Sequence, residues 1–136
     1  MMYAQNKAAA YRNVRNHGLV ADASPTRLVQ IMYEQILTEL AIAQGCMGRI
    51  RNNVPFKEVV TKCKSMSKAL RLIGHLDATL DMEQGAKISE NLHNLYLYML
   101  GRLTTANVEN DAAIVSEIAS LVRTIKLGWD QIVERQ

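Results

Sequence analysis

The sequence predicts an all-α fold: an antiparallel, up-down-up-down four-helix bundle with a mobile N-terminal tail. Apolar residues recur every three or four positions through four long segments, which is the period of an amphipathic helix. Capping and turn residues separate these segments, and no run alternates between apolar and polar residues as a strand would. Because long helices joined by short loops pack as antiparallel neighbours, we expect one bundle domain over 24–136 and a tail over 1–23.

The first two helices have clear starting signals. Ser24 can cap a helix that begins at Pro25 and ends near residues 52–53. A second helix is expected to open at 53 or 54, with Pro55 in its first turn, and to stop before a turn at 81–85. The expected core faces are Leu28, Met32, Ile36, Leu40, Ala43 and Met47 for the first helix, and Phe56, Val59, Val60, Cys63, Met66, Leu70, Ile73, Leu76 and Leu80 for the second.

The third and fourth helices follow the break at Gly85. The third is expected to end within 107–110, and either Asn110 or Asp111 should cap the fourth. Their expected core faces are Ile88, Leu92, Leu95, Met99, Leu103 and Ala106, then Ile114, Ile118, Leu121, Ile125, Trp129 and Ile132. Residues 1–23 are polar, basic and rich in alanine, so they are expected to form the tail.

Composition excludes several classes of protein. A net charge of +3 without a DNA-binding motif gives no reason to expect a nucleic-acid partner. Cys46 and Cys63 match no metal-binding or redox motif. The N-terminus lacks the apolar run of a signal peptide, and no apolar stretch approaches the ~20 residues that span a bilayer. We therefore expect a cytoplasmic protein without membrane insertion.

No catalytic or metal-binding constellation can be assembled from the sequence. Glu90 and His93 form a Glu-x-x-His motif, which di-iron bundles use twice, but it occurs once here. His93 is therefore expected to face solvent rather than bind a metal. No Ser-His-Asp set, Cys-His set or glycine-rich phosphate loop can be argued. We expect no enzymatic activity, no metal and no cofactor.

Two surface features indicate partner binding instead. The third helix carries more apolar residues than a stripe of roughly 100° requires, which predicts an apolar groove between the second and third helices. The residues expected to border it are Met66, Leu70, Ile73, Tyr96, Met99 and Leu103. Basic residues share one face of the second helix, namely Lys57, Lys64, Lys68 and Arg71. This stripe is either a solvated face or a surface that steers an acidic partner electrostatically.

The order and spacing of three motifs make the chain similar to a known family. The motifs are Ala10-Tyr11 followed by Ala23-Ser24-Pro25, Leu28 and Met32-Tyr33; then Leu80-Asp81, Glu83, Gly85, Ile88, Asn91-Leu92, Leu95-Tyr96, Tyr98-Met99, Arg102-Leu103 and Ala106-Asn107; and last Asn110-Asp111 and Trp129. Over roughly residues 10–132 the chain resembles the FliS family of flagellar export chaperones. Ala86 and Gly101 depart from the usual pattern, and Gly101 is expected to loosen the third helix or open space beside Tyr98.

The resemblance implies a bundle that binds the disordered C-terminal segment of flagellin in the cytoplasm. Such a chaperone prevents premature polymerisation and helps deliver flagellin to the type III export gate. The resemblance also implies that Tyr11 contacts the export machinery. From the apolar residues of the tail we expect it to fold back over the groove, with Tyr11 and Val14 as anchors one turn apart, until the client displaces it.

A second class of function stays open at this point. A helical adaptor or regulator that binds another folded protein would expose similar apolar faces. The sequence also leaves open whether the chain is a monomer or a dimer.

Overall fold

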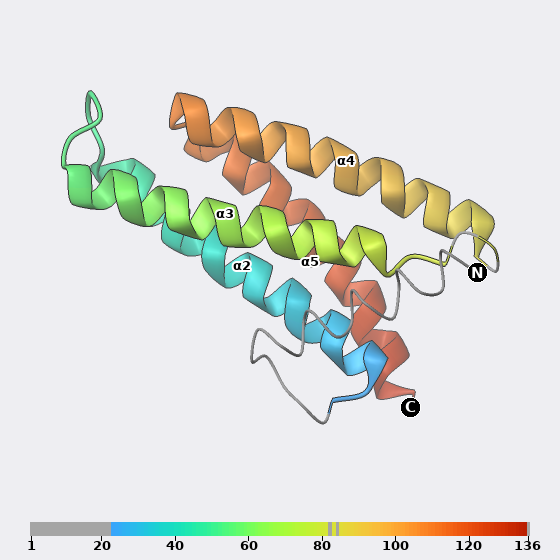
Figure 1. Cartoon of the computed structure of the whole chain (residues 1–136). Coiled ribbons are helices and arrows are strands. Elements are labelled where there is room, and N and C mark those ends of the chain that lie inside the picture. The colour runs from blue at the N-terminus through green and yellow to red at the C-terminus, as the bar shows by residue number, and fades with distance from the viewer. Residues whose placement is uncertain (1–22, 82, 84, 136) are drawn as a thin grey trace.

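The computed structural model describes residues 23–81, 83 and 85–135, which fold into four packed α-helices. They are α2 (Pro25–Arg49), α3 (Phe56–Ala78), α4 (Ala86–Glu109) and α5 (Ala112–Glu134). Figure 1 shows each helix running back along the one before it. Both α2 and α4 pack against α3 and α5, so α2 and α4 lie on one diagonal of the bundle. The predicted all-α, four-helix architecture is confirmed, whereas the tail at residues 1–22 lies outside the described residues.

The predicted caps are present at two helix starts. Ser24 Oγ accepts a hydrogen bond from the Arg27 backbone N–H at 3.2 Å, with Pro25 in the first turn of α2. Asp111 caps α5 and accepts from the backbone N–H groups of Ala113 and Ile114. Asn110 instead ends α4 in the left-handed region, with φ 55°, a conformation that asparagine tolerates well.

Helix α3 begins slightly later than predicted. Arg51 and Val54 exchange backbone hydrogen bonds of 2.9 and 3.1 Å around Asn52 and Asn53, which both have positive φ. The residue before a proline is disfavoured in helical backbone, so Val54 stays extended and Pro55 becomes the cap of α3. The two asparagines therefore form a tight reverse turn between α2 and α3.

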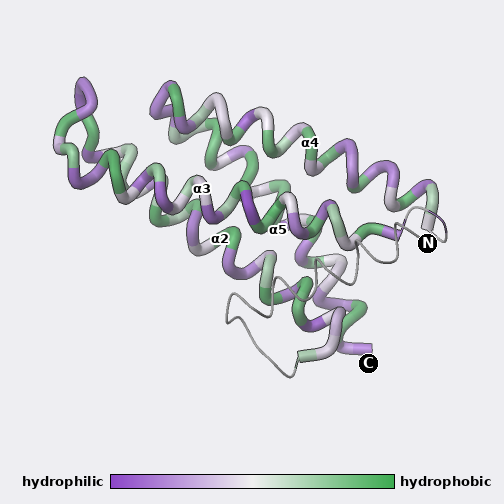
Figure 2. The backbone as a smooth tube through the Cα atoms, in the orientation of Figure 1, coloured by the Kyte–Doolittle hydropathy of each residue, from purple (hydrophilic) through white to green (hydrophobic). Residues whose placement is uncertain are grey.

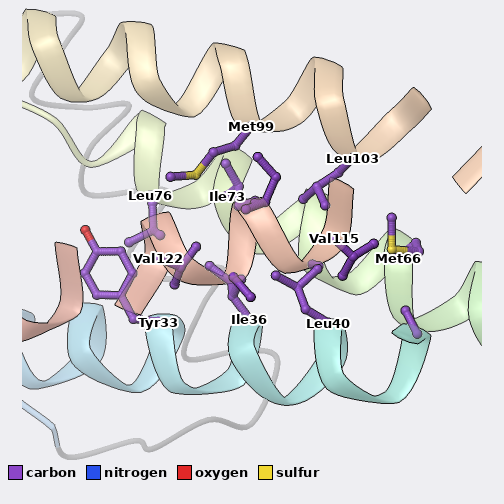
Figure 3. Close-up of a cluster of buried hydrophobic side chains, with 14 of the residues drawn as sticks. Tyr33, Ile36, Leu40, Met66, Ile73, Leu76, Met99, Leu103, Val115 and Val122 are labelled. Atoms are coloured by element: carbon purple, nitrogen blue, oxygen red, sulfur yellow. The ribbon is translucent and has the colours of Figure 1, made fainter. Parts of the chain in front are cut away.

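The core runs along the centre of the bundle and contains every residue predicted for the first helix (Figure 3). It also contains five of the six residues predicted to border a groove: Met66, Ile73, Tyr96, Met99 and Leu103 are at most 2% exposed. Leu70 is half-buried and packs against them. These residues therefore do not border an open groove between α3 and α4, because their side chains pack in the core of the bundle. A role for them in client binding stays a prediction.

The beginning of α3 turns its predicted apolar stripe away from this core. Phe56 is 78% exposed, and Val60 and Cys63 are only half-buried. Lys62 points inward instead, and its Nζ donates to the Asn107 carbonyl at 2.9 Å. A cation is favourable there because the last turn of α4 presents unpaired carbonyl groups.

Helices α4 and α5 diverge from their short connection. In the described part of α5, no residue beyond Val122 is buried, and before Tyr96 the only buried residue of α4 is Ser89. Ile88 is 71% exposed and Ile132 is 44% exposed, although both were predicted to face the core. Figure 2 shows hydrophobic residues continuing into this diverging region, which we call the open end of the bundle.

Truncating a core residue and an exposed residue of α4 will separate core from groove. Leu103→Ala should lower the free energy of unfolding by about 2–5 kcal/mol, because it leaves a cavity in the core. Leu97→Ala, at a position 51% exposed, should cost about 0.5 kcal/mol or less. Urea denaturation measures both. A loss at Leu103 as small as that at Leu97, together with weakened client binding, would contradict the core assignment.

Candidate functional site: an apolar pocket at the open end

A pocket of about 230 Å³ lies where α2 and α4 begin and α3 and α5 end. Most of its wall is apolar. The described residues that line it are Val29, Tyr33, Leu76, Thr79, Leu80, Asp81, Ile88, Ser89, Leu92, Tyr96 and Trp129. We call it the open-end pocket, and it lies at the level of the bundle where α4 and α5 have separated (Figure 1).

Three aromatic residues, Tyr33, Tyr96 and Trp129, line the pocket. The hydroxyls of Tyr33 and Tyr96 are 2.7 Å apart and form a buried hydrogen bond across the α2–α4 diagonal. Trp129 stands edge-on to Tyr33, with ring centroids 6.5 Å apart. Burial raises the pKa of both tyrosines above the ordinary value, so both stay neutral phenols. Each hydroxyl is satisfied by the other, which leaves the rings to present apolar surface.

The end of α5 is fastened to α2 beside the pocket. Trp129 Nε1 donates to the Thr26 carbonyl at 2.8 Å. Asp130 accepts hydrogen bonds from Lys126 and Gln30 at 2.8 and 2.7 Å, and these contacts lower the pKa of its carboxyl group. Because α5 is held against α2 here, it cannot close over the start of α4.

The start of α4 is fastened to α3 instead. Ser89 Oγ donates to the Asp81 carbonyl at 2.8 Å. His93 Nδ1 lies 2.7 Å from Asp77 Oδ1 while its side chain is 38% exposed, so the predicted solvent-facing histidine also contacts a carboxylate of α3. Asp77 near the end of α3 and His93 in the first half of α4 lie across the α3–α4 turn from each other, so the carboxylate of Asp77 can contact the imidazole ring of His93. The start of α4 is thus held beside the end of α3, whereas the end of α5 is held beside α2.

Neither a metal-binding cluster nor a membrane-spanning helix is found among the described residues. Among residues 23–81, 83 and 85–135, no three His, Cys, Asp or Glu side chains gather in a metal-binding arrangement. Within the same ranges, no helix combines the length and apolar character needed to cross a bilayer. The lining of the pocket is mostly apolar, so it can accommodate apolar side chains of another polypeptide, with few polar groups to fix their orientation.

The other predicted site residues lie elsewhere. The four basic residues are exposed along α3, outside the lining of the pocket: Lys57, Lys64, Lys68 and Arg71. Tyr11 and Val14 lie outside the described residues. Helix α4 continues without interruption through Gly101, and the Tyr98 hydroxyl donates to the Glu117 carboxylate on α5.

Comparison with known proteins identifies the family. The sequence model of the protein family described as flagellar protein FliS matches residues 6–136 of this chain. The chain belongs to the FliS family. It is 37% identical to the flagellar secretion chaperone FliSB of Pseudomonas aeruginosa, over 96% of this chain and 98% of that protein. It is 35% identical to the flagellar secretion chaperone FliS of Salmonella typhimurium, over 96% of this chain and 93% of that one. The protein is thus a secretion chaperone of this family and not an enzyme.

The FliS resemblance already contained the signal for the pocket. Ile88, Leu92 and Trp129 belong to the motifs that carry the resemblance, and the structure brings them together around Tyr33 and Tyr96. Periodicity alone assigned Ile88, Leu92 and Trp129 to the core, because a helical period shows which residues share a face but not where two helices separate.

Removing one hydroxyl of the tyrosine pair should cost more than half of the stability that is lost when both hydroxyls are removed. Tyr33→Phe should cost about 1–3 kcal/mol, because the buried Tyr96 hydroxyl loses its partner. The double Phe variant should lose clearly less than the sum of the two single variants. Thermal and urea denaturation provide the comparison, with Tyr98→Phe as a control at a position 44% exposed. Strictly additive losses would show that the two hydroxyls do not interact.

Proposed function

We propose that this chaperone binds the C-terminal segment of flagellin before export, and that the open-end pocket is part of the binding surface. The single observation that supports this role is the apolar pocket left by the divergence of α4 from α5. A disordered segment that folds on binding lays its apolar side chains into such grooves. An α-helix is about 10–12 Å across, so a pocket of this size takes side chains rather than a whole helix.

The surroundings of the pocket extend this surface. Ile88 continues the apolar wall onto the exposed side of α4, and Ile132, which is 44% exposed, follows one helical turn after Trp129 on α5. Contacts of this kind are individually modest, which suits a client that has to be released. In this proposal the chain captures flagellin in the cytoplasm, prevents its premature polymerisation and delivers it to the export gate.

A matched pair of substitutions on α4 tests the position of the client. Ile88→Gln, at the rim of the pocket, should weaken binding of a flagellin C-terminal peptide roughly tenfold, the equivalent of about 1.4 kcal/mol. Val108→Gln makes a similar change at a residue 81% exposed near the other end of α4, and should leave the affinity within about twofold. Isothermal titration calorimetry gives both affinities and the stoichiometry.

Both positions are exposed, so the melting temperatures should barely change. Equal effects of the two substitutions would place the client elsewhere on the bundle. The same titration followed by circular dichroism separates the chaperone from an adaptor of folded proteins, because only a disordered client gains helix on binding.

The N-terminal segment gives a further prediction about client release. If Tyr11 and Val14 anchor it over apolar surface that the client also uses, deleting residues 1–20 should tighten client binding and increase the fluorescence of a dye that binds apolar surface. The deletion should also weaken delivery if Tyr11 contacts the export gate. Unchanged affinity together with unchanged dye binding would show that the segment does not cover that surface.

A further inference from the structure

The exposed face of α3 carries a second surface that the open-end pocket does not use. A groove of about 480 Å³ runs along the first two-thirds of this helix. Its floor is apolar and includes Val59, Val60 and Cys63, with Phe56 at one end. Its edge is basic and consists of Lys64, Lys68 and Arg71. We call this surface the basic groove.

The charge of this groove is not neutralised by the chain itself. In the described ranges, the structure contains no ion pair or hydrogen bond from the side chains of Lys57, Lys64, Lys68 and Arg71. The acid nearest in sequence, Glu58, is paired with Arg49 at 3.0 Å. The carboxylate of Glu58 is thus engaged by Arg49 at the turn between α2 and α3, and the edge of the groove stays positive. Three exposed cations beside an apolar strip, Lys64, Lys68 and Arg71, form a surface that favours an acidic and partly apolar partner.

We propose that the basic groove docks an acidic amphipathic helix of a partner protein. The apolar side chains of such a helix would cover Phe56 and Val60, and its carboxylates would meet Lys64 and Lys68. Charge complementarity of this kind directs association and selects the partner. Binding of the partner helix would bury the apolar strip and neutralise the unpaired cations at the same time.

Charge also argues against other occupants. The segment 1–22 of this chain contains Lys7, Arg12 and Arg15 against one acid, Asp22, so it would be repelled by the groove. A second copy of the chain would bring identical lysine rows face to face. A nucleic acid would leave the apolar floor uncovered, and among the described residues of the lining Phe56 alone is an aromatic that could stack.

The basic groove and the open-end pocket are lined by different residues. Lys62 and Cys63 contact Asn107 near the end of α4, whereas Ile88 stands near its start. At 1.5 Å per residue, Phe56 at the start of the groove is about 30 Å along α3 from Leu76 of the pocket, whereas Arg71 at its other end is about 7.5 Å from Leu76. A partner helix docked over Phe56, Val60 and Lys64 therefore leaves the open-end pocket free for a client, and this inference does not depend on the identity of that client.

The test uses the full-length chain and a synthetic acidic amphipathic helix of about 15 residues. Leucines occupy one face of the probe peptide and glutamates flank them. Two control peptides have the same leucine face with glutamine in place of glutamate, or the same composition with the leucines scattered. Fluorescence anisotropy should show one acidic peptide bound per chain, at least about tenfold tighter than either control.

Protein variants locate the peptide. Lys68→Glu should weaken binding about tenfold, whereas Arg123→Glu, the same change of charge at an exposed position of α5, should alter it less than about twofold. Phe56→Ala should weaken it about fivefold, since its ring is one end of the apolar floor. Raising the salt concentration should slow association of the acidic peptide, because exposed charges are screened over a Debye length of about 8–10 Å.

Saturating the chain first with a flagellin C-terminal segment should leave the peptide affinity unchanged. Displacement of the peptide by that segment would overturn the inference, because the two surfaces would then be one. Equal weakening by Lys68→Glu and Arg123→Glu would overturn it as well, as would tighter binding of a single-stranded oligonucleotide than of the acidic peptide. If the flagellin segment does not bind at all, the proposed function fails but the peptide measurements still decide the role of the basic groove.

Discussion

Helix α5 follows α2 along its whole length, and the open end of the bundle depends on this constraint. Near the start of α5, Gln44 Nε2 donates to Ser116 Oγ at 2.6 Å, and near its end Trp129 donates to the Thr26 carbonyl. Helix α4 is linked to the beginning of α5 through Arg102 and Glu117, but its own start is held to the end of α3 and the following turn through Asp77 and Asp81. The divergence of α4 and α5 is therefore a consequence of how the two helices are anchored.

The separation leaves apolar surface that a fully closed bundle would bury. The hydrogen bond between Tyr33 and Tyr96 makes this arrangement possible, because it joins the diagonal helices and satisfies two polar groups below the opening. Above this pair, Ile88 and Trp129 are only partly covered. A closed arrangement would gain buried area at each of these residues, and it would leave no place for the apolar side chains of a client. The bundle thus combines a well-packed half with a half suited to binding.

The fold could be predicted almost completely from the sequence, and the site only in part. Periodicity and capping identified four helices, and Ser24 and Asp111 cap two of them as predicted. The start of α3 was less clear, because the effect of Pro55 on Val54 competes with helix formation. Ile88 and Met99 show why the site was harder to predict: both belong to one apolar stripe, yet one is 71% exposed and the other fully buried. The distance between neighbouring helices decides this difference, and a helical period does not contain that distance.

The single tryptophan of the chain offers the most direct test of the central claim, because Trp129 forms part of the pocket wall. A flagellin C-terminal segment without tryptophan can be titrated into the protein while the emission of Trp129 is recorded. If the client fills the open-end pocket, the emission should shift to shorter wavelength as the ring loses contact with water, and the shift should saturate at one segment per chain. Binding detected by anisotropy of a labelled segment, with no change in Trp129 emission, would contradict the account.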